Sequence, residues 1–144
     1  MRLVFDTAVM VAAIRSDRGA SRWLLRAALE QSHDFSLLVS VPLLIEYEAV
    51  MTRPEHLRVA RLSTADVASL LDGVVGIVEP VTLNFLWRPV LPDGDDDMVL
   101  EAAVNGRADG IVTFNRRDFG PATDQFGIAL WAPGGLVRRL ETKT

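Results

Sequence analysis

The chain has 144 residues, enough for one domain with a substantial core but too few for two independent ones, so we expect a single domain spanning residues 1–144. Apolar residues make up 49% of the chain and charged residues 24%, which is typical of a globular protein and excludes a disordered or fibrous one. The formal net charge of −4 argues against attraction of nucleic acid by the whole surface, although a local basic patch can still bind it.

The first half of the chain alternates short apolar runs with helical patterns. Apolar side chains recur at intervals of three and four between residues 20 and 31, the spacing of an amphipathic helix. In chain order we expect a strand at Arg2–Phe5, helices at Ala8–Ile14 and Ala20–Gln31, a strand at Phe35–Ser40, and a helix at Leu43–Met51 with Pro42 in its first turn. Pro54 ends this last helix or starts another.

The second half continues the alternation. We expect a helix at Asp66–Gly73 introduced by Ser63 and Thr64, an extended segment at Gly76–Leu83, a helix from an acidic cluster to about Gly106, and strands at Asp109–Phe114 and Phe126–Trp131. Helices alternating with short apolar strands predict an α/β fold, a three-layer α/β/α sandwich around a mainly parallel sheet. No apolar run approaches the roughly 20 residues of a membrane-spanning helix, so we expect a cytoplasmic protein that does not contact a membrane.

The acidic cluster consists of Asp93, Asp95, Asp96 and Asp97. Aspartates in the first turn of a helix cap free amides and face the positive end of the helix dipole, which accounts for one or two of them. An EF-hand loop is excluded, because its sixth position would be Met98 and its twelfth Val104. A magnesium or manganese site remains as the alternative to capping, since a divalent cation offsets the repulsion among carboxylates.

Further polar side chains follow two predicted strands directly. Asp6 comes after Arg2–Phe5, and Asn115 and Asp118 come after the strand that ends at Phe114. In a parallel sheet the carboxyl ends of the strands lie at one edge, so these residues can converge with Asp97. The absence of cysteine and the wide separation of the two histidines argue against zinc. The only lysine is Lys143, which argues against aspartate-based phosphatases and receiver domains.

Four segments together resemble the PIN-domain family, in the branch of VapC-like toxins of toxin–antitoxin systems. They are "LVFDTAVMVAAI", "LLVSVPLLIEYEAVMTRPEH", "LPDGDDDMVLEAAVNGRADGIVTFNRRDF" and "FGIALWAPGGLVRRL", in the order of the family's motifs and over nearly the whole chain. The resemblance implies a compact α/β nuclease in which acidic side chains bind one or two Mg²⁺ or Mn²⁺ ions and RNA is the substrate.

The resemblance also assigns roles to particular residues. By position in the motifs, it implies that Asp6, Glu46 and Asp97 bind the metal, and that Asn115 and Asp118 complete the catalytic set. Helical periodicity by itself does not choose between Glu46 and Glu48, and either glutamate can equally be part of a solvated helix face.

Contacts to RNA and to partners are expected from the same reading. Thr7 is a candidate for a phosphate contact, although its hydroxyl can instead cap the helix that follows. Arg15, Arg22 and Arg116 are candidates for phosphate contacts, with ordinary solvated charge as the alternative. We expect a small antitoxin protein as a partner and a homodimer. Ala8 and Asn115 replace polar and acidic side chains usual in the family, and they favour an alternative function: a PIN-fold binding module with weakened catalysis.

Overall fold

The computed structural model describes residues 1–84 and 94–142, without the side chains of residues 94–96 and 122. Five strands form one sheet in the order β3-β2-β1-β4-β5, and each of the four neighbouring pairs is parallel. The strands are β1 (Arg2–Phe5), β2 (Ser36–Ser40), β3 (Glu79–Val81), β4 (Gly110–Val112) and β5 (Ala129–Trp131).

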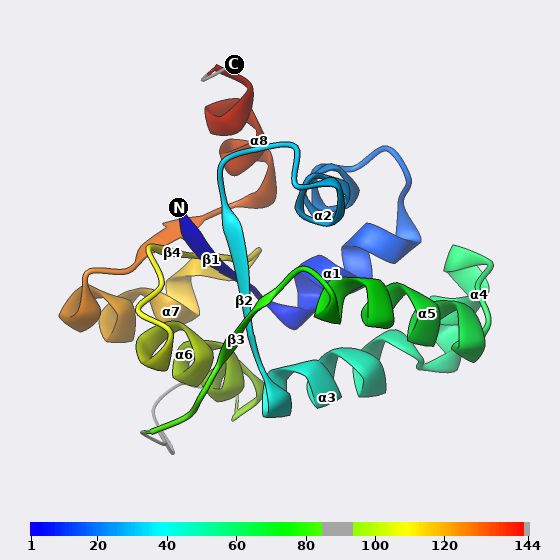
Figure 1. The fold of residues 1–144 in the computed structure, drawn as a ribbon, viewed down its shortest axis with the longest axis horizontal. Coiled ribbons are helices and arrows are strands. Elements are labelled where there is room, and N and C mark those ends of the chain that lie inside the picture. The colour runs from blue at the N-terminus through cyan, green and yellow to red at the C-terminus, as the bar shows by residue number, and fades with distance from the viewer. Residues whose placement is uncertain (85–93, 143–144) are drawn as a thin grey trace.

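Helices cover both faces of this sheet. Figure 1 shows α6 and α7 on one side of the strands and α1, α2 and α5 on the other. The helices are α1 (Thr7–Arg15), α2 (Ala20–Glu30), α3 (Val41–Met51), α4 (Pro54–Ala60), α5 (Thr64–Val75), α6 (Gly94–Asn105), α7 (Arg116–Thr123) and α8 (Pro133–Thr142), with a 3₁₀ turn at Asp124–Phe126. The predicted α/β/α sandwich with a parallel sheet is therefore confirmed. None of the helices in the described ranges combines the length and apolarity needed to span a membrane.

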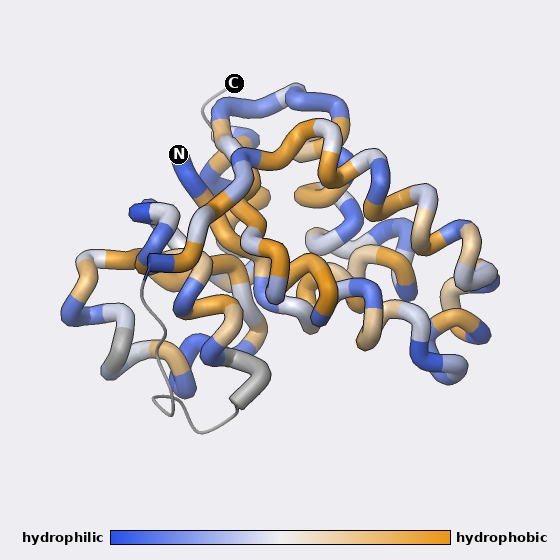
Figure 2. The backbone as a smooth tube through the Cα atoms, turned by 60° about the horizontal axis from the view of Figure 1, so that its bottom comes forward, coloured by the Kyte–Doolittle hydropathy of each residue, from blue (hydrophilic) through white to orange (hydrophobic). Residues whose placement is uncertain are grey.

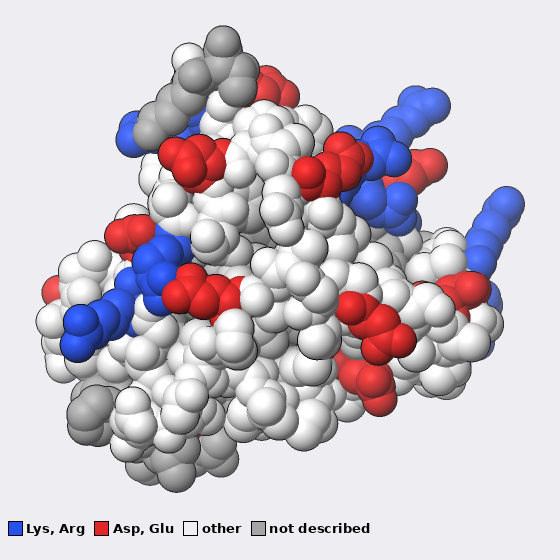
Figure 3. Space-filling view, in the orientation of Figure 1, with Lys and Arg blue, Asp and Glu red and all other residues white. Residues whose placement is uncertain are grey.

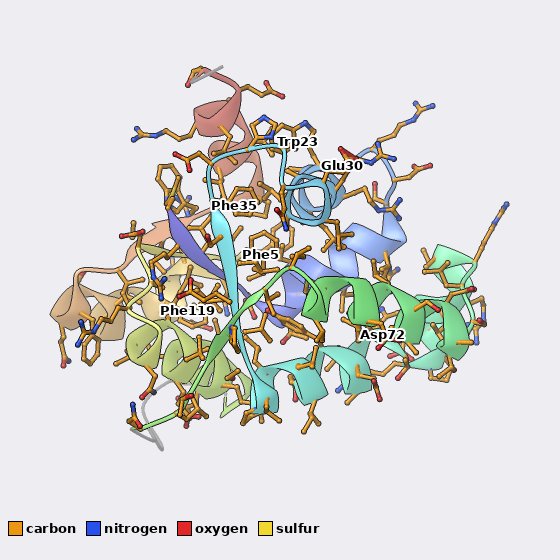
Figure 4. All side chains as sticks on the ribbon, viewed as in Figure 1. Phe5, Trp23, Glu30, Phe35, Asp72 and Phe119 are labelled. Atoms are coloured by element: carbon orange, nitrogen blue, oxygen red, sulfur yellow. The ribbon has the colours of Figure 1, made fainter. Side chains whose placement is uncertain are left out.

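The strand β1 is the buried centre of the sheet. Leu3, Val4 and Phe5 are completely inaccessible to solvent, as expected for a strand covered on both faces. The ring of Phe5 lies beside that of Phe35, with 6.2 Å between centroids (Figure 4). The backbone coloured by hydropathy shows the same organisation, with apolar segments running through the middle of the molecule and hydrophilic residues at its loops (Figure 2).

Two helices were not predicted from the sequence. Helix α7 contains Pro121, which cannot donate a backbone hydrogen bond, and it is tolerated because the helix spans only 8 residues. Helix α8 begins at Pro133 and carries two glycines in its first turn, and both residue types conceal a helical pattern. Its helical identity rests on packing, because Leu136 and Leu140, one turn apart, are both buried in the core.

Other differences concern the bounds of elements. Pro54 starts α4 instead of merely ending α3. Strands β4 and β5 are 3 residues each, shorter than the predicted Asp109–Phe114 and Phe126–Trp131, because Asp109, Thr113 and Phe114 are bends or irregular backbone and the 3₁₀ turn that precedes β5 includes Phe126. Helix α6 begins at Gly94, so that Asp95, Asp96 and Asp97 lie inside its first turn. Asp93 lies outside the described residues.

Candidate active site

Asp6 is the first residue after the central strand, and its carboxylate is turned towards the neighbouring strand. It occupies the N-cap position of α1, yet its side chain makes no capping hydrogen bond. Its Oδ2 instead accepts a hydrogen bond of 2.7 Å from the hydroxyl of Thr113. Capping would stabilise the helix by about 1 kcal/mol, so this geometry holds the carboxylate at the strand ends at the expense of helix stability.

Thr113 was not predicted to belong to the site. The ladder between β1 and β4 pairs Phe5 with Val112, which places the next residues, Asp6 and Thr113, side by side. Thr113 is fully buried, and its Oγ1 also accepts a hydrogen bond from the backbone N–H of Asn115 at 2.9 Å. In the sequence, the only indication of a role for Thr113 is that it is a hydroxyl residue directly after an apolar strand. The strand order is needed to show which carboxylate it contacts.

Tyr47 supports the same end of β1 from helix α3. Its side chain is fully buried, and its hydroxyl donates a hydrogen bond to the backbone carbonyl of Phe5. Burial raises the pKa of Tyr47 well above its ordinary value, and the nearby negative charge of Asp6 raises it further. The phenol therefore stays neutral and donates to the backbone immediately before Asp6.

A pocket of about 330 Å³ opens at this edge of the sheet. Asp6, Glu46 and Asn115 all line it, which brings together three of the residues predicted from the motifs. Glu46 is half-buried, whereas Glu48 is exposed and does not line the pocket. The structure therefore separates the two glutamates that helical periodicity leaves equivalent.

Thr7 also lines this pocket, at the first residue of α1. Its Oγ1 is buried and forms no hydrogen bond with the described part of the protein. The capping role considered for this hydroxyl is thus not found. A buried hydroxyl without a hydrogen-bond partner is costly, so Thr7 brings an unsatisfied polar group to the lining of the pocket.

Helix α6 contributes buried carboxylates from the opposite face of the sheet. Asp97 is only 4% exposed, and Glu101, one turn later, is completely buried. The helix packs against β1, β2 and α3, but Asp97 does not line the pocket that Asp6 and Glu46 share. Glu101 was not predicted as a site residue, because "MVLEAAV" reads as an apolar helix interrupted by one charge.

Asn115 and Asp118 form a pair at the start of α7. The side-chain Nδ2 of Asn115 donates to Oδ2 of Asp118, and the backbone N–H of Asp118 donates to the carbonyl of Asn115 at 3.2 Å. Asn115 lines the pocket, but Asp118 does not. Since its amide nitrogen is engaged with Asp118, Asn115 offers its amide oxygen to the pocket.

The donor set suits a hard divalent cation. Asp6 and Glu46 supply carboxylate oxygens and Asn115 an amide oxygen, the ligand types that Mg²⁺ and Mn²⁺ prefer. In residues 1–84 and 94–142, no three histidine, aspartate or glutamate side chains are grouped closely enough to hold an ion. The side chains of Asp95 and Asp96 lie outside the described residues. The residues therefore fit such an ion by their chemistry, and Asp6 and Glu46 are the carboxylates that share the pocket.

The arginines predicted to contact RNA lie in different places. Arg15 ends α1, and its Nη1 lies 3.0 Å from Nδ1 of His56, which lines the pocket. Arg22 lines a separate cavity of about 440 Å³ between α2 and α5, where its guanidinium donates to the carbonyls of Ala13 and Ile14. Arg116 is exposed at the first residue of α7.

Comparison with known proteins gives a family and a fold. The family model described as PIN domain matches residues 2–117. A chain in the crystal structure of VapBC2 from Rickettsia felis, bound to a DNA fragment from their promoter, has a similar fold, with a TM-score of 0.56. That alignment has 15% sequence identity and covers 92% of this chain and 98% of the other. No curated protein sequence matches the chain.

Proposed function

This chain belongs to the PIN-domain family, and from that premise we propose that it is a Mg²⁺- or Mn²⁺-dependent endoribonuclease, the toxin of a type II toxin–antitoxin pair. PIN domains are generally nucleases that use divalent metal ions. The observation that carries the proposal is the shared pocket of Asp6, Glu46 and Asn115 at the carboxyl ends of β1 and β4. In parallel sheets this edge is where ligands bind.

The proposed mechanism is hydrolysis of an RNA phosphodiester. Asp6 and Glu46 would hold the ion in the pocket, and Asp97, which the structure does not group with them, is the third carboxylate that the family motifs assign to it. The ion would supply Lewis-acid polarisation of the phosphate and a more acidic bound water. Thr113 fixes the carboxylate of Asp6 by its 2.7 Å hydrogen bond, and Tyr47 fixes the backbone before it. The hydroxyl of Thr7 is placed to donate to a phosphate oxygen. Asn115 and Asp118 keep each other oriented at the pocket rim.

RNA needs a contact for its bases as well as its phosphates. Phe114 lines the same pocket and is 59% exposed, although large aromatic side chains are usually buried. An exposed ring beside the scissile phosphate gives a stacking surface for one base of a single strand. Of the arginines predicted from the sequence to contact RNA, Arg15 reaches His56 of this pocket, and Arg116 adjoins Asn115.

The test is cleavage of RNA by the purified chain with and without divalent metal. We expect Asp6→Asn and Asp97→Asn to abolish cleavage and Glu46→Gln to reduce it at least about 100-fold, as removal of charged groups from a metal site does. Glu48→Gln is the matched control, because it makes the same change two positions later on α3, at a glutamate that is exposed and does not line the pocket. Equal cleavage by wild type, Asp6→Asn and Asp97→Asn in Mn²⁺ and in chelator would contradict the assignment.

The second candidate function is a binding module without catalysis. Ala8 is exposed in the pocket and contributes only a methyl group, and Asn115 contributes no charge. This alternative predicts that the chain binds RNA or a protein partner while Asp6→Asn changes neither binding nor any cleavage. Replacing Asn115 by aspartate would then raise metal affinity, measured by calorimetry, and create cleavage.

The proposed partners are a small antitoxin and a second copy of the chain. The fold likeness to a VapBC2 chain supports the first. The exposed apolar side chains of Val41 and Ile45, one turn apart on α3, support the second. Sedimentation of wild type and Ile45→Glu tests the homodimer, with a monomeric wild type as the contradicting result. Co-expression with a candidate small antitoxin, followed by measurement of RNA cleavage, tests the antitoxin, and unchanged cleavage in the complex would contradict it.

A further inference from the structure

We propose that Arg15, Arg53 and His56 form a phosphate-binding subsite at the end of the candidate active-site pocket remote from its carboxylates. This subsite holds a second phosphate of single-stranded RNA while the scissile phosphate lies at Asp6 and Glu46. The inference rests on the proposed function for its substrate class, and nothing in the sequence motifs assigns Arg53 or His56 a role.

The three residues come together where α1 meets α4. Arg53 and His56 line the same pocket as Asp6 and Glu46. Arg53 is the N-cap residue of α4 and His56 lies in its first turn, while Arg15 is the last residue of α1. The contact between Nη1 of Arg15 and Nδ1 of His56 is 3.0 Å, and α1 and α4 pack against each other. The lining of the pocket therefore contains both acidic and basic side chains, and Arg15 contacts it through His56.

The Arg15–His56 contact fixes which imidazole nitrogen can bind a ligand. A guanidinium has only donors, so Nδ1 of His56 must accept and the ring hydrogen must lie on Nε2. Nε2–H is then a donor, as are the N–H groups of Arg53. A phosphodiester offers only acceptor oxygens at neutral pH, and charge-assisted hydrogen bonds from arginine are the usual way to bind it.

The two arginines of the proposed subsite differ from other arginines of the described chain in their ion pairing. Within the described residues, neither Arg15 nor Arg53 forms an ion pair, whereas Arg2 pairs with Glu79 and Arg26 with Glu30. Figure 3 shows basic side chains projecting at the end of the molecule that carries α4 and the α1–α2 loop. Arg15 and Arg53 are thus cations without an ion-pair partner among the described residues of a chain whose net charge is −4.

The competing explanation is structural: the Arg15–His56 contact only ties α1 to α4. The two explanations differ in what Arg53 does, because Arg53 is exposed, lines the pocket and has no role in that tie. A purely structural cluster predicts lower stability in Arg15→Gln and no effect of Arg53→Gln on RNA. A phosphate subsite predicts an effect of Arg53→Gln on RNA affinity at unchanged stability.

The experiment measures binding of a fluorescein-labelled single-stranded RNA of about 10 nucleotides, within the site sizes of compact single-strand binders, by fluorescence anisotropy in chelator. We expect Arg53→Gln to weaken binding about fivefold, the effect of one exposed charge contact. The slope of log K against log salt should fall in magnitude by about 0.7, the value for one phosphate contact on a single strand. Arg58→Gln is the matched control, since Arg58 is an exposed arginine on the same helix that does not line the pocket.

A double-mutant cycle then locates the phosphate. RNAs in which single phosphates are replaced by neutral methylphosphonate should include one position that weakens wild-type binding about fivefold and leaves Arg53→Gln binding unchanged. Equal effects of Arg53→Gln and Arg58→Gln, or a methylphosphonate penalty that persists in Arg53→Gln at every position, would overturn the subsite. Because binding is measured without metal, the two proposals can fail separately. Absence of RNA cleavage would overturn the proposed function alone. RNA cleavage together with unchanged RNA binding by Arg53→Gln would overturn the subsite alone.

Discussion

The hydroxyl of Thr113 donates a hydrogen bond of 2.7 Å to Oδ2 of Asp6, between residues 107 positions apart in the chain. Removing this bond by Thr113→Val should lower kcat for RNA cleavage roughly 10- to 100-fold, as loss of a partner of a metal-site ligand does. KM should change little, because Thr113 is buried away from RNA. Thr113→Ser, which keeps the hydroxyl, should restore most of kcat, and a variant that loses only thermal stability would contradict this positioning role.

The raised pKa of Tyr47 predicts that the free energy of unfolding decreases at alkaline pH. Its pKa is raised in the folded protein, so the neutral phenol favours folding fully below the unfolded pKa of about 10, and this contribution is lost as pH rises towards the folded pKa. Urea unfolding should show stability decreasing above about pH 10 in wild type and a flatter profile in Tyr47→Phe.

The composition of the chain allows the titration of Tyr47 to be followed without interference from other side chains. Tyr47 is the only tyrosine and the chain has no cysteine, so absorbance of tyrosinate follows this one side chain. Lys143 is present in both proteins and its contribution cancels between them. A Tyr47→Phe variant with the same alkaline slope as wild type would contradict the pKa shift.

Gly106 ends helix α6 at a close approach to β2 and β3. A Cβ at this position would lie 2.9 Å from the Ala102 carbonyl oxygen, 2.9 Å from Cγ2 of Val81 and 3.0 Å from Cδ1 of Leu38. Gly106→Ala should therefore lower the free energy of unfolding by about 1–3 kcal/mol, measured in urea. Gly120→Ala is the control, since its added Cβ has open space in helix α7 and should stabilise by up to about 1 kcal/mol.

Phe114 tests the proposed contact with an RNA base. Phe114→Ala should raise KM for single-stranded RNA roughly 5- to 100-fold, the range for loss of one base-stacking contact, with a smaller effect for Phe114→Trp. Ile45→Ala is the control, because Ile45 is 63% exposed but does not line the pocket. Equal KM values for Phe114→Ala and wild type would show that the ring does not stack on a base.

Arg22 is expected to contribute to stability and not to RNA affinity. Its guanidinium donates to two carbonyls in the last turn of α1, so Arg22→Met should lower the free energy of unfolding by about 1–2 kcal/mol. RNA cleavage at a temperature where the variant is folded should be unchanged. A larger effect on KM than on stability would restore Arg22 as an RNA contact.

The sequence predicts those site residues that closely follow an apolar strand. Asp6 and Asn115 each follow an apolar strand, and a parallel sheet brings such positions to one edge whatever the strand order. The role of Thr113 could not be predicted in this way. Its contact with Asp6 depends on β4 being the neighbour of β1 and on the register of that strand pair. Neither is encoded in local hydrophobicity.

Residues on helices depend on packing that periodicity does not resolve. Both Glu46 and Glu48 lie among apolar neighbours on α3, and only the docking of α3 beside α1 shows that Glu46 reaches the pocket. Arg53 and His56 lie in a segment that resembles the family but were given no role from the sequence, since the contact of His56 with Arg15 requires α4 to pack against α1. Helices α7 and α8 were missed because proline and glycine obscured patterns that tertiary contacts stabilise.

The central place of β1 in the sheet has a consequence for synthesis of the protein. This strand is synthesised before the other strands of the sheet, but its two neighbours are β2 and β4, and β4 begins only at Gly110. A nascent chain can therefore display Asp6 long before Thr113 exists to hold its carboxylate. A translation product that ends before β4 lacks the Thr113 contact, so the proposed nuclease activity would arise only after β4 has been synthesised.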